Sequence, residues 1–485
     1  MSSASQRSVH PDLILGICCL SLLLVGMDVT IVNVALSDIQ KDLHATLSQL
    51  QWVVDAYTLV VASFLILAGS MADRFGRRRV FQLGLSLFIF GSVLCSLAHS
   101  IGGLVAFRVV QALGASMLNP VALSIIANTF QERRARARAL GIWGAVAGLS
   151  FALGPLVGGA LTQSVGWRSI FWINLPIGIA ALGLTAYFVQ ESKAERARPV
   201  DPVGQGLVLL TLMSLTYAVI EGPHLNWNSG VIRGLFLVAA GALIALLVYE
   251  PRRTDPLLDL RFFRSVPFSS ATVIAACAFA TFAGFLFLNT LYLQQVRGLS
   301  AFHAGLCTLP LALMTMVCAP ISGKLVGTYG TRPPLLLAGV TLCLSTLLLT
   351  RLTAETSFPM LLTIYFIFGI GFGLVNAPIS NTAVSGMPQA QAGVAAAIAS
   401  TSRQVGAALG VAVSGTLAGA GSTLGPKFAL ATHPVWWIMA ASGALIFLLG
   451  WISNTRWAQD STKKVADLLG ETKINKTMTT EPAHS

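Results

Sequence analysis

Runs of apolar residues long enough to cross a membrane repeat along almost the whole chain, from residue 13 to residue 453. An α-helix of about 20 apolar residues spans the hydrocarbon core of a bilayer. Of the 485 residues, 55% are hydrophobic and only 10% are charged, whereas about 25% of the residues in soluble domains are charged. A water-soluble fold cannot bury so many apolar side chains, so the sequence predicts an all-α membrane protein.

We predict a membrane span wherever about 18 or more mainly apolar residues occur with few charges. The first run follows Arg7 and could be a signal peptide, but it continues to Leu36 without a small-residue cleavage site, so we expect it to be retained as a span. The fourteen predicted spans are 13–36, 52–71, 79–97, 103–125, 139–162, 169–189, 204–222, 234–250, 267–291, 304–326, 333–352, 358–380, 392–417 and 434–453.

The basic residues predict the orientation of these spans. Arginine and lysine favour short cytoplasmic loops, and here they gather after the second, fourth, sixth and eighth spans, as at Arg77, Arg134, Lys193 and Arg252. An even number of spans places both termini on one side, so both are predicted to be cytoplasmic. This topology accounts for much of the formal net charge of +12.

Two parts of the sequence repeat one another. Gly69–Arg78 and Gly323–Arg332 share two glycines, an aromatic residue and an arginine at equal offsets, and Gly114–Asn119 corresponds in the same way to Gly371–Asn376. Related halves of this kind form transporters with a site near the membrane midplane. The predicted domains are 1–190, an N-terminal six-helix half; 191–265, two inserted helices with cytoplasmic linkers; 266–455, a C-terminal six-helix half; and 456–485, a polar cytoplasmic tail.

Motifs that the sequence lacks exclude several kinds of chemistry. It has no Gly-x-x-x-x-Gly-Lys-Ser/Thr phosphate loop, so ATP is not expected to drive this protein, and no metalloprotease or hydrolase motif, so no enzyme activity is predicted. The seven cysteines lie in apolar runs without CxxC spacing, so we expect packing roles and no metal or other cofactor. The basic residues form no patch on a soluble module, so nucleic acid is not a predicted partner.

Few charged residues lie well inside the predicted spans, namely Asp28, Asp55, Arg108 and Arg403, while Glu221 and Glu250 lie near span ends. A charge in the bilayer core costs at least about 2.5–3.5 kcal/mol, so each needs a partner or a function. Between residue 267 and the tail the only acid is Glu355, so proton binding is assigned to the first half. Asp28, Asp55 and Arg108 are the predicted proton-coupling residues, and a structural ion pair or helix bond is the alternative.

Four motifs are similar to those of one transporter family. They are Asp28–Leu36 in the first span, Gly69–Arg78 in the next loop, Arg108–Ala115 in the fourth span, and the glycines between Gly141 and Gly159 in the fifth. Together they resemble the major facilitator superfamily and, within it, the fourteen-helix drug:proton antiporter branch. The resemblance in the fifth span implies export rather than uptake.

The match departs from the branch pattern at three positions. Ser37 stands where proline is usual, and Ala112 and Ser150 replace glycines. Trp167–Pro176 and Ser402–Gly406 also resemble the branch. The resemblance therefore extends over most of the chain.

Residue chemistry and the resemblance together give a set of predicted site residues. The loop after the second span can latch one conformation through charge-assisted bonds, with a solvated topogenic loop as the alternative. A Gly-Pro pair bends the fifth span, with simple helix packing as the alternative. Asn119 and Asn376 could contact a substrate, with hydrogen bonding to the backbone of kinked helices as the alternative. The latch residues are Gly69, Asp73, Arg74, Gly76, Arg77 and Arg78; the antiporter-motif residues are Gly154, Pro155, Gly158 and Gly159; and the possible substrate-cavity residues are Asn33, Gln111, Asn119, Asn376 and Arg403.

The predicted function is export of small organic molecules, such as drugs, antibiotics or secondary metabolites, by a proton-coupled antiporter. The partners are the substrate and the lipid bilayer, and the protein is expected to be a monomer in an inner (plasma) membrane of bacterial type. Because acids are scarce, neutral or monocationic substrates are expected. A proton-coupled importer of the same fold is one alternative. A membrane sensor or scaffold is the other, which the lack of a soluble module disfavours.

Overall fold

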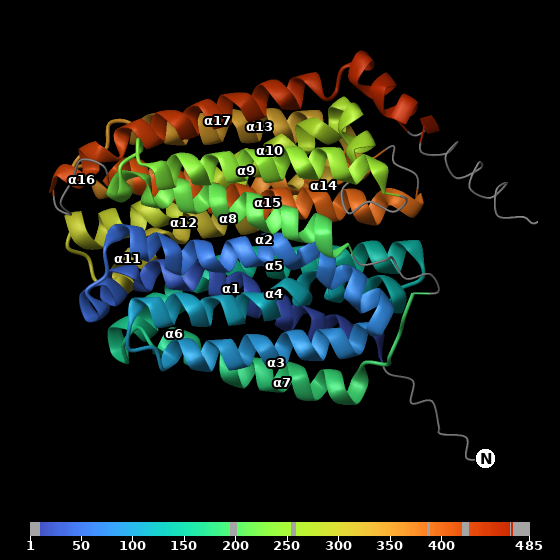
Figure 1. Ribbon diagram of the computed structural model, residues 1–485, viewed down its shortest axis with the longest axis horizontal. Helices are drawn as coiled ribbons and strands as arrows, with labels where there is room; N and C mark the ends of the chain where they lie inside the picture. The colour runs from blue at the N-terminus through green and yellow to red at the C-terminus, as the bar shows by residue number, and fades with distance from the viewer. Residues whose placement is uncertain are drawn as a thin grey trace, which may run out of the picture. The chain divides into compact units, whose positions relative to one another are not determined.

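The computed structural model describes residues 10–194, 201–253, 259–385, 389–419, 426–465 and 467–468. Within these ranges all regular secondary structure is helical (Figure 1). Most of the predicted tail, from residue 469 onward, lies outside the described residues. Two compact units divide the chain, and each is considered by itself.

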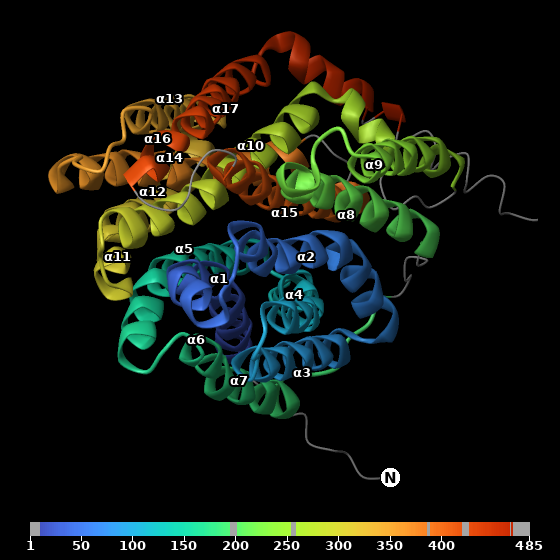
Figure 2. The same ribbon diagram turned by 60° about the vertical axis from the view of Figure 1, so that its left-hand side comes forward.

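The first unit comprises Met1–Val200 and Thr290–Ala312. Figure 2 shows that α4 lies between α1, α2 and α3. The helices of this unit are α1 (Pro11–Leu43), α2 (Leu47–Phe75), α3 (Arg77–Ser96), α4 (Ile101–Thr129), α5 (Arg133–Ser164), α6 (Ser169–Trp172), α7 (Asn174–Phe188), the π-helix η3 (Tyr292–Val296) and α11 (Ala301–Cys307).

The second unit comprises Asp201–Asn289 and Leu313–Ser485. One boundary between the units therefore falls just before α8, and the other two fall inside α10 and α12. The helices of this unit are α8 (Pro202–Leu225), α9 (Gly230–Tyr249), the 3-10 helices η1 (Glu250–Arg252) and η2 (Leu260–Arg264), α10 (Val266–Leu291), α12 (Leu309–Tyr329), α13 (Arg332–Leu349), α14 (Phe358–Val384), α15 (Gln389–Gly419), α16 (Pro426–Ala431) and α17 (His433–Ile452).

Thirteen helices in the described part are long and apolar enough to cross a membrane. They coincide with thirteen of the predicted spans. The predicted span 392–417 does form a helix, α15, but it is not among the thirteen. Its Arg403, its Gln404 and its many small residues lower its hydropathy, so apolar character alone does not identify it as a span.

The inserted pair, α8 and α9, pack against each other, and α8 also contacts α15. Thr416 Oγ1 of α15 donates a hydrogen bond to the carbonyl of Val219 in α8 at 2.9 Å. Much of α9 is exposed, including Val231, Leu237 and Ile244. An exposed apolar face on a membrane helix is suited to contact with lipid.

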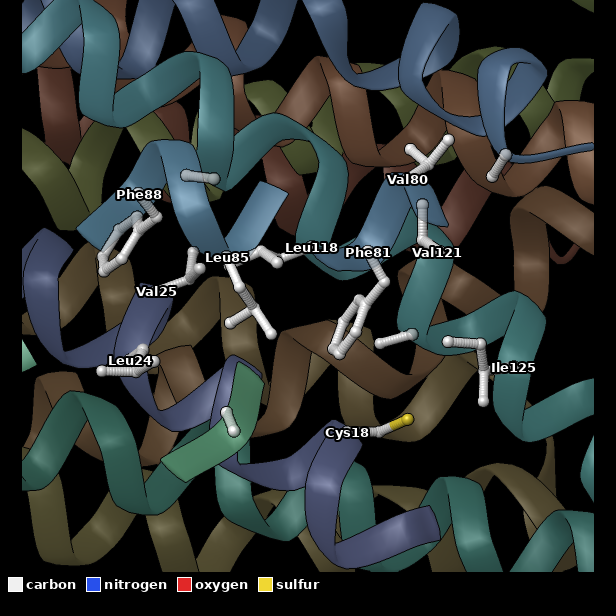
Figure 3. Close-up of a cluster of buried hydrophobic side chains, with 14 of the residues drawn as sticks. Cys18, Leu24, Val25, Val80, Phe81, Leu85, Phe88, Leu118, Val121 and Ile125 are labelled. Atoms are coloured by element: carbon white, nitrogen blue, oxygen red, sulfur yellow. The ribbon is translucent and has the colours of Figure 1, made fainter. Parts of the chain in front are cut away.

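The core of the first unit forms where α1, α3 and α4 meet. Figure 3 shows Phe81 and Phe88 of α3 among side chains from α1 and α4. Glycine allows this close approach, because a Cβ atom at Gly114 of α4 would lie 2.3 Å from the backbone nitrogen of Phe88. Small residues at helix interfaces let membrane helices pack by van der Waals contact.

A methyl group at position 114 should therefore push α3 and α4 apart. We expect Gly114→Ala to lower the Tm of the purified protein, with an overpacking cost of about 1–3 kcal/mol. Gly102→Ala is the matched control, because no atom lies within 4 Å of a Cβ built at Gly102 of the same helix. Thermal unfolding can be followed with a thiol-reactive dye that reports exposure of buried cysteines such as Cys18 and Cys95. Equal Tm values for the two variants would contradict this account of the α3–α4 contact.

Candidate functional site

A buried ion pair joins α1 and α4 in the first unit. Arg108 Nη1 donates a hydrogen bond to Asp28 Oδ2 at 2.6 Å. Both residues are almost completely buried, with exposed fractions of 1% and 0%. Two opposite charges in direct contact compensate part of the large cost of removing each from water. The structure thus brings together two of the three predicted proton-coupling residues.

Amide side chains complete the coordination of this pair. Gln111 Nε2 donates to Asp28 Oδ1 at 2.8 Å and its Oε1 accepts from Arg108 at 2.7 Å. Asn174 Nδ2, at the start of α7, donates to Asp28 Oδ1 at 3.2 Å and to Ser92 Oγ of α3 at 3.0 Å. Asp28 therefore accepts hydrogen bonds from three side chains, which supports its ionised form.

Helix α2 contacts the Arg108 guanidinium group through one face. The carbonyl of Val53 accepts a hydrogen bond from Arg108 Nε at 3.3 Å, and the ring of Tyr57 lies 4.2 Å from the guanidinium carbon. Val53 and Tyr57 are four residues apart and so share a face of α2. Asp55, two residues from each, is turned from that face by about 200°. The structure therefore does not bring Asp55 into the ion pair.

Asp55 is fully buried, with an exposed fraction of 0%. Neither of its carboxylate oxygens has a hydrogen-bond partner within the described ranges. An ionised carboxylate in such surroundings carries a large desolvation cost, whereas a protonated one is neutral. The two predicted carboxylates thus occupy opposite environments, one paired and one without a partner.

The predicted latch is organised around the sharp turn between α2 and α3. Gly76 has a φ angle of +113°, a conformation that favours glycine. Arg77 Nη2 donates to Asp73 Oδ1 at 3.2 Å. Gly69 has no atom within 4 Å of a Cβ built on it, and exposed Arg74 lies 5.7 Å from the Phe75 ring.

A carboxylate that the sequence analysis did not single out holds this turn. Glu191, after α7, accepts hydrogen bonds from the backbone nitrogens of Arg78 at 3.1 Å and Arg79 at 3.3 Å. These are free N–H groups at the start of α3, where a negative charge is favourable. A Cβ atom at Gly76 would lie 2.5 Å from the Glu191 carboxyl carbon. Arg78 also donates to the carbonyl of Ala186.

The glycines of α5 fit against α1. A Cβ atom at Gly154 would lie 1.8 Å from Thr30 Oγ1, and one at Gly158 would lie 2.4 Å from a side-chain carbon of Ile31. Such positions admit only glycine without a shift of the neighbouring helix. Close packing is therefore part of what this motif does.

The remaining two residues of the motif contact α11. A Cβ atom at Gly159 would lie 2.6 Å from the carbonyl oxygen of Ala301. In the reverse direction, a Cβ atom at Gly305 would lie 2.3 Å from the carbonyl oxygen of Pro155. The segment Thr290–Ala312 is thereby packed onto α5 as part of the first unit.

The predicted cavity residues have different surroundings. Gln111 belongs to the buried ion-pair network and is fully buried. Asn33 Nδ2 donates to its own helix at Val29, and Asn376 Nδ2 donates to Phe372 at 3.4 Å. Asn119 is partly buried and its Oδ1 has no hydrogen-bond partner in the described part. Arg403 Nη2 in the second unit donates to Ser380 Oγ at 2.6 Å.

The sequence analysis missed several groups in the buried network. Asn174 lies in the Trp167–Pro176 stretch that resembles the antiporter branch, so a signal was present without a role attached. Ser92 and Tyr57 carry no motif that would have identified them. No cluster of three or more His, Cys, Asp or Glu side chains is placed to hold a metal ion within the residues searched.

Comparison with known proteins gives consistent matches. The model of the Major Facilitator Superfamily matches residues 18–411. The chain is 39% identical over 400 residues to the multidrug resistance protein Stp of Mycobacterium tuberculosis, covering 82% of this chain and 74% of that protein. It is 36% identical over 398 residues to the tetracenomycin C resistance and export protein of Streptomyces glaucescens, with coverage of 82% and 74%. The crystal structure of a D-xylose–proton symporter has the same fold, with a TM-score of 0.65 at 15% identity, covering 91% of this chain and 97% of that one.

The contact of Glu191 with the start of α3 can be tested by proteolysis. Glu191→Ala removes the acceptor from two backbone N–H groups, so we expect the closed turn to lose about 1 kcal/mol, or roughly fivefold in the open population. Trypsin should then cleave after Arg77, Arg78 or Arg79 correspondingly faster. Glu132→Ala is the control, because Glu132 precedes α5 without a side-chain capping bond. An unchanged cleavage rate in Glu191→Ala would show that this carboxylate does not stabilise the turn.

Proposed function

Because the chain belongs to the Major Facilitator Superfamily, we propose that it exports drugs, antibiotics or related secondary metabolites in exchange for protons. It is a multi-pass protein of the plasma membrane and a transporter rather than an enzyme. Its relatives include proteins named for multidrug resistance and for tetracenomycin C resistance and export. The observation that carries proton coupling is the pair of buried carboxylates, Asp28 with a cation partner and Asp55 without one.

We further propose a topology of fourteen spans with both termini in the cytoplasm. Thirteen helices qualify by hydropathy, and α15 is long enough, at 31 residues, to be the fourteenth. The basic loops after alternate spans support the cytoplasmic placement of the termini. Each six-helix half contributes one side of the transport pathway, and the protein works as a monomer.

In the proposed mechanism one carboxylate carries the proton and the other forms the ion pair. Asp55 holds a proton in the described conformation, because its buried site offers no donor for an anion. Asp28 is ionised, because Arg108, Gln111 and Asn174 donate to it. When rearrangement admits water to Asp55, the proton leaves and a new negative charge appears in the same unit as Arg108. This charge then acts on the ion pair through α2, which contacts Arg108 at Val53 and Tyr57.

An inward proton can supply enough free energy for this function. Movement of one charge through about 100 mV yields about 2.3 kcal/mol, and half a pH unit adds roughly 0.7 kcal/mol. One proton would therefore support an outward gradient on the order of a hundredfold for a neutral substrate.

Asp73 and Arg77 of the latch, together with Glu191, would hold one conformation between transport steps.

The carboxylates also limit the charge of the substrate. Arg108 occupies Asp28, and the proton occupies Asp55 for part of the cycle. A dication would need two free carboxylates to replace its lost hydration, since an unpaired buried charge is very unfavourable. Neutral or monocationic net charge is therefore proposed for the substrates.

The roles of the carboxylates can be tested in proteoliposomes with an imposed pH gradient. We expect Asp28→Asn and Asp55→Asn each to abolish uphill export of ethidium or tetracenomycin C, whichever the wild-type protein transports faster. Glu355→Gln, in an exposed loop, is the control and should keep the wild-type rate. Uphill export that survives both single substitutions would overturn the proposed proton coupling.

The limit on substrate charge can be tested with a matched pair of dyes. Ethidium is a monocation and propidium is a dication with the same ring system. We expect pH-driven export of propidium to be at least tenfold slower than export of ethidium in the same proteoliposomes. Comparable rates for the two dyes would contradict the argument from the scarcity of carboxylates.

A further inference from the structure

Arg108 and Arg403, the two arginines predicted to lie well inside the membrane, have opposite surroundings. Arg108 in the first unit has Asp28 as a direct partner. Arg403 in α15 of the second unit forms no salt bridge with any acid in the described ranges. Its Nε atom also lacks a hydrogen-bond partner there, and its one recorded hydrogen bond goes from Nη2 to Ser380 Oγ. Arg403 is therefore a cation without a counter-ion.

The sequence offers this arginine no acid from the neighbouring helices. Between residues 260 and 459 the only Asp or Glu is Glu355, which is exposed in the loop between α13 and α14. Helix α8 does contact α15, and it carries Glu221. However, the contact joins Val219 of α8 to Thr416, which is about 20 Å along α15 from Arg403. Glu221 therefore lies at a different depth.

Its position also excludes neutralisation by lipid headgroups. Arg403 is about 16 Å from one end and about 21 Å from the other end of the predicted span 392–417, since a helix rises about 1.5 Å per residue. Each distance exceeds the reach of an arginine side chain, which can snorkel to the interface only from near a helix end. A permanent charge at this depth needs a partner that the chain itself does not supply.

Aromatic rings lie beside the guanidinium. The Arg403 guanidinium carbon is 5.9 Å from the centroid of the Phe279 ring in α10. Phe372 of α14 contacts Phe279 edge-on at 5.3 Å and stacks on Phe282 at 3.9 Å. Arg403 as a residue is partly exposed and Ser380 is exposed, whereas the Arg403 Nε atom itself is buried. Apolar aromatic walls with a few fixed polar groups are typical of small-molecule sites.

We propose that Arg403 binds an acidic oxygen group, a carboxylate or an ionised enol or phenol, on an aromatic substrate. The free Nε and an adjacent terminal nitrogen form the edge of guanidinium that matches such a group in a bidentate manner. The partly exposed ring of Phe279 contacts the aromatic part of the substrate, and buried Phe282 and Phe372 hold that ring in place. This inference rests on the proposed export function and defines the substrate class further. A substrate with one acidic and one basic group has the neutral net charge proposed above.

The proposal can be tested by binding to the full-length protein in lipid nanodiscs. The probes are 2-naphthoate and 2-naphthamide, which have the same ring and differ in the charge of one group. Isothermal titration calorimetry should give a Kd at least tenfold lower for 2-naphthoate. Arg403→Met should abolish this preference without changing the Kd of 2-naphthamide, and Arg403→Lys should retain part of it. Phe279→Leu should weaken binding of both probes by a similar factor.

A Tm measurement shows whether the variants fold and tests the absence of a counter-ion. Removing a charge that has no counter-ion should leave the Tm of Arg403→Met unchanged or higher. Arg108→Met is the matched comparison and should lower the Tm, because it leaves Asp28 buried without its partner. A large loss of Tm in Arg403→Met would show that Arg403 has a structural partner, and it would overturn the proposal.

Two binding results would also overturn it. One is an equal Kd for 2-naphthoate and 2-naphthamide in the wild-type protein, and the other is a preference for 2-naphthoate that survives in Arg403→Met. Either result together with intact pH-driven export would reject the role of Arg403 and leave the export function standing. Binding that follows the proposal in a protein without pH-driven export would instead reject the proposed coupling alone.

Discussion

The ion pair between Asp28 and Arg108 is the interaction on which the first unit depends. It connects α1 to α4 directly and reaches α7 through Asn174 and α2 through the carbonyl of Val53. An ionised group in the membrane needs a partner when water is absent, because an unsatisfied charge there is very costly. One polar network therefore links α1, α2, α3, α4 and α7 of the first unit.

Close backbone contact provides the second constraint. In a bilayer the lipid chains are as apolar as the side chains, so helix association relies on packing rather than on the hydrophobic effect. Gly114 allows α4 to approach α3 closely. In the same way Gly154 allows α5 to approach α1, and Gly159 allows it to approach α11. The antiporter motif of α5 is thus a set of contact points. A change in the α5–α11 contact would release the Thr290–Ala312 segment from the first unit, since that segment joins it from α10 and α12.

The charges are distributed asymmetrically between the two units. The membrane helices of the first unit contain Asp28 and Asp55, whereas α10 to α17 contain the unpaired Arg403 and no acid in their described residues. In the proposed mechanism the first unit binds the proton, and the second unit recognises an acidic oxygen of the substrate. Proton binding and substrate recognition would then lie on different halves. A transporter that couples ion and substrate movement can use such a division, because rearrangement of the halves affects both sites together.

The sequence by itself determined the membrane class, the positions of the helices and the candidate charges. Apolar runs of span length report local composition, which does not depend on distant contacts. The predicted span 392–417 does form a helix, but Arg403 lowers its hydropathy, so local composition alone does not show that this helix crosses the membrane. Only the tertiary structure decided which charges have partners: Asp28 meets Asn174, which is 146 residues away, whereas Asp55 faces away from Arg108. Spacing along the chain gives no information on such contacts, because they depend on how the helices rotate and pack against one another.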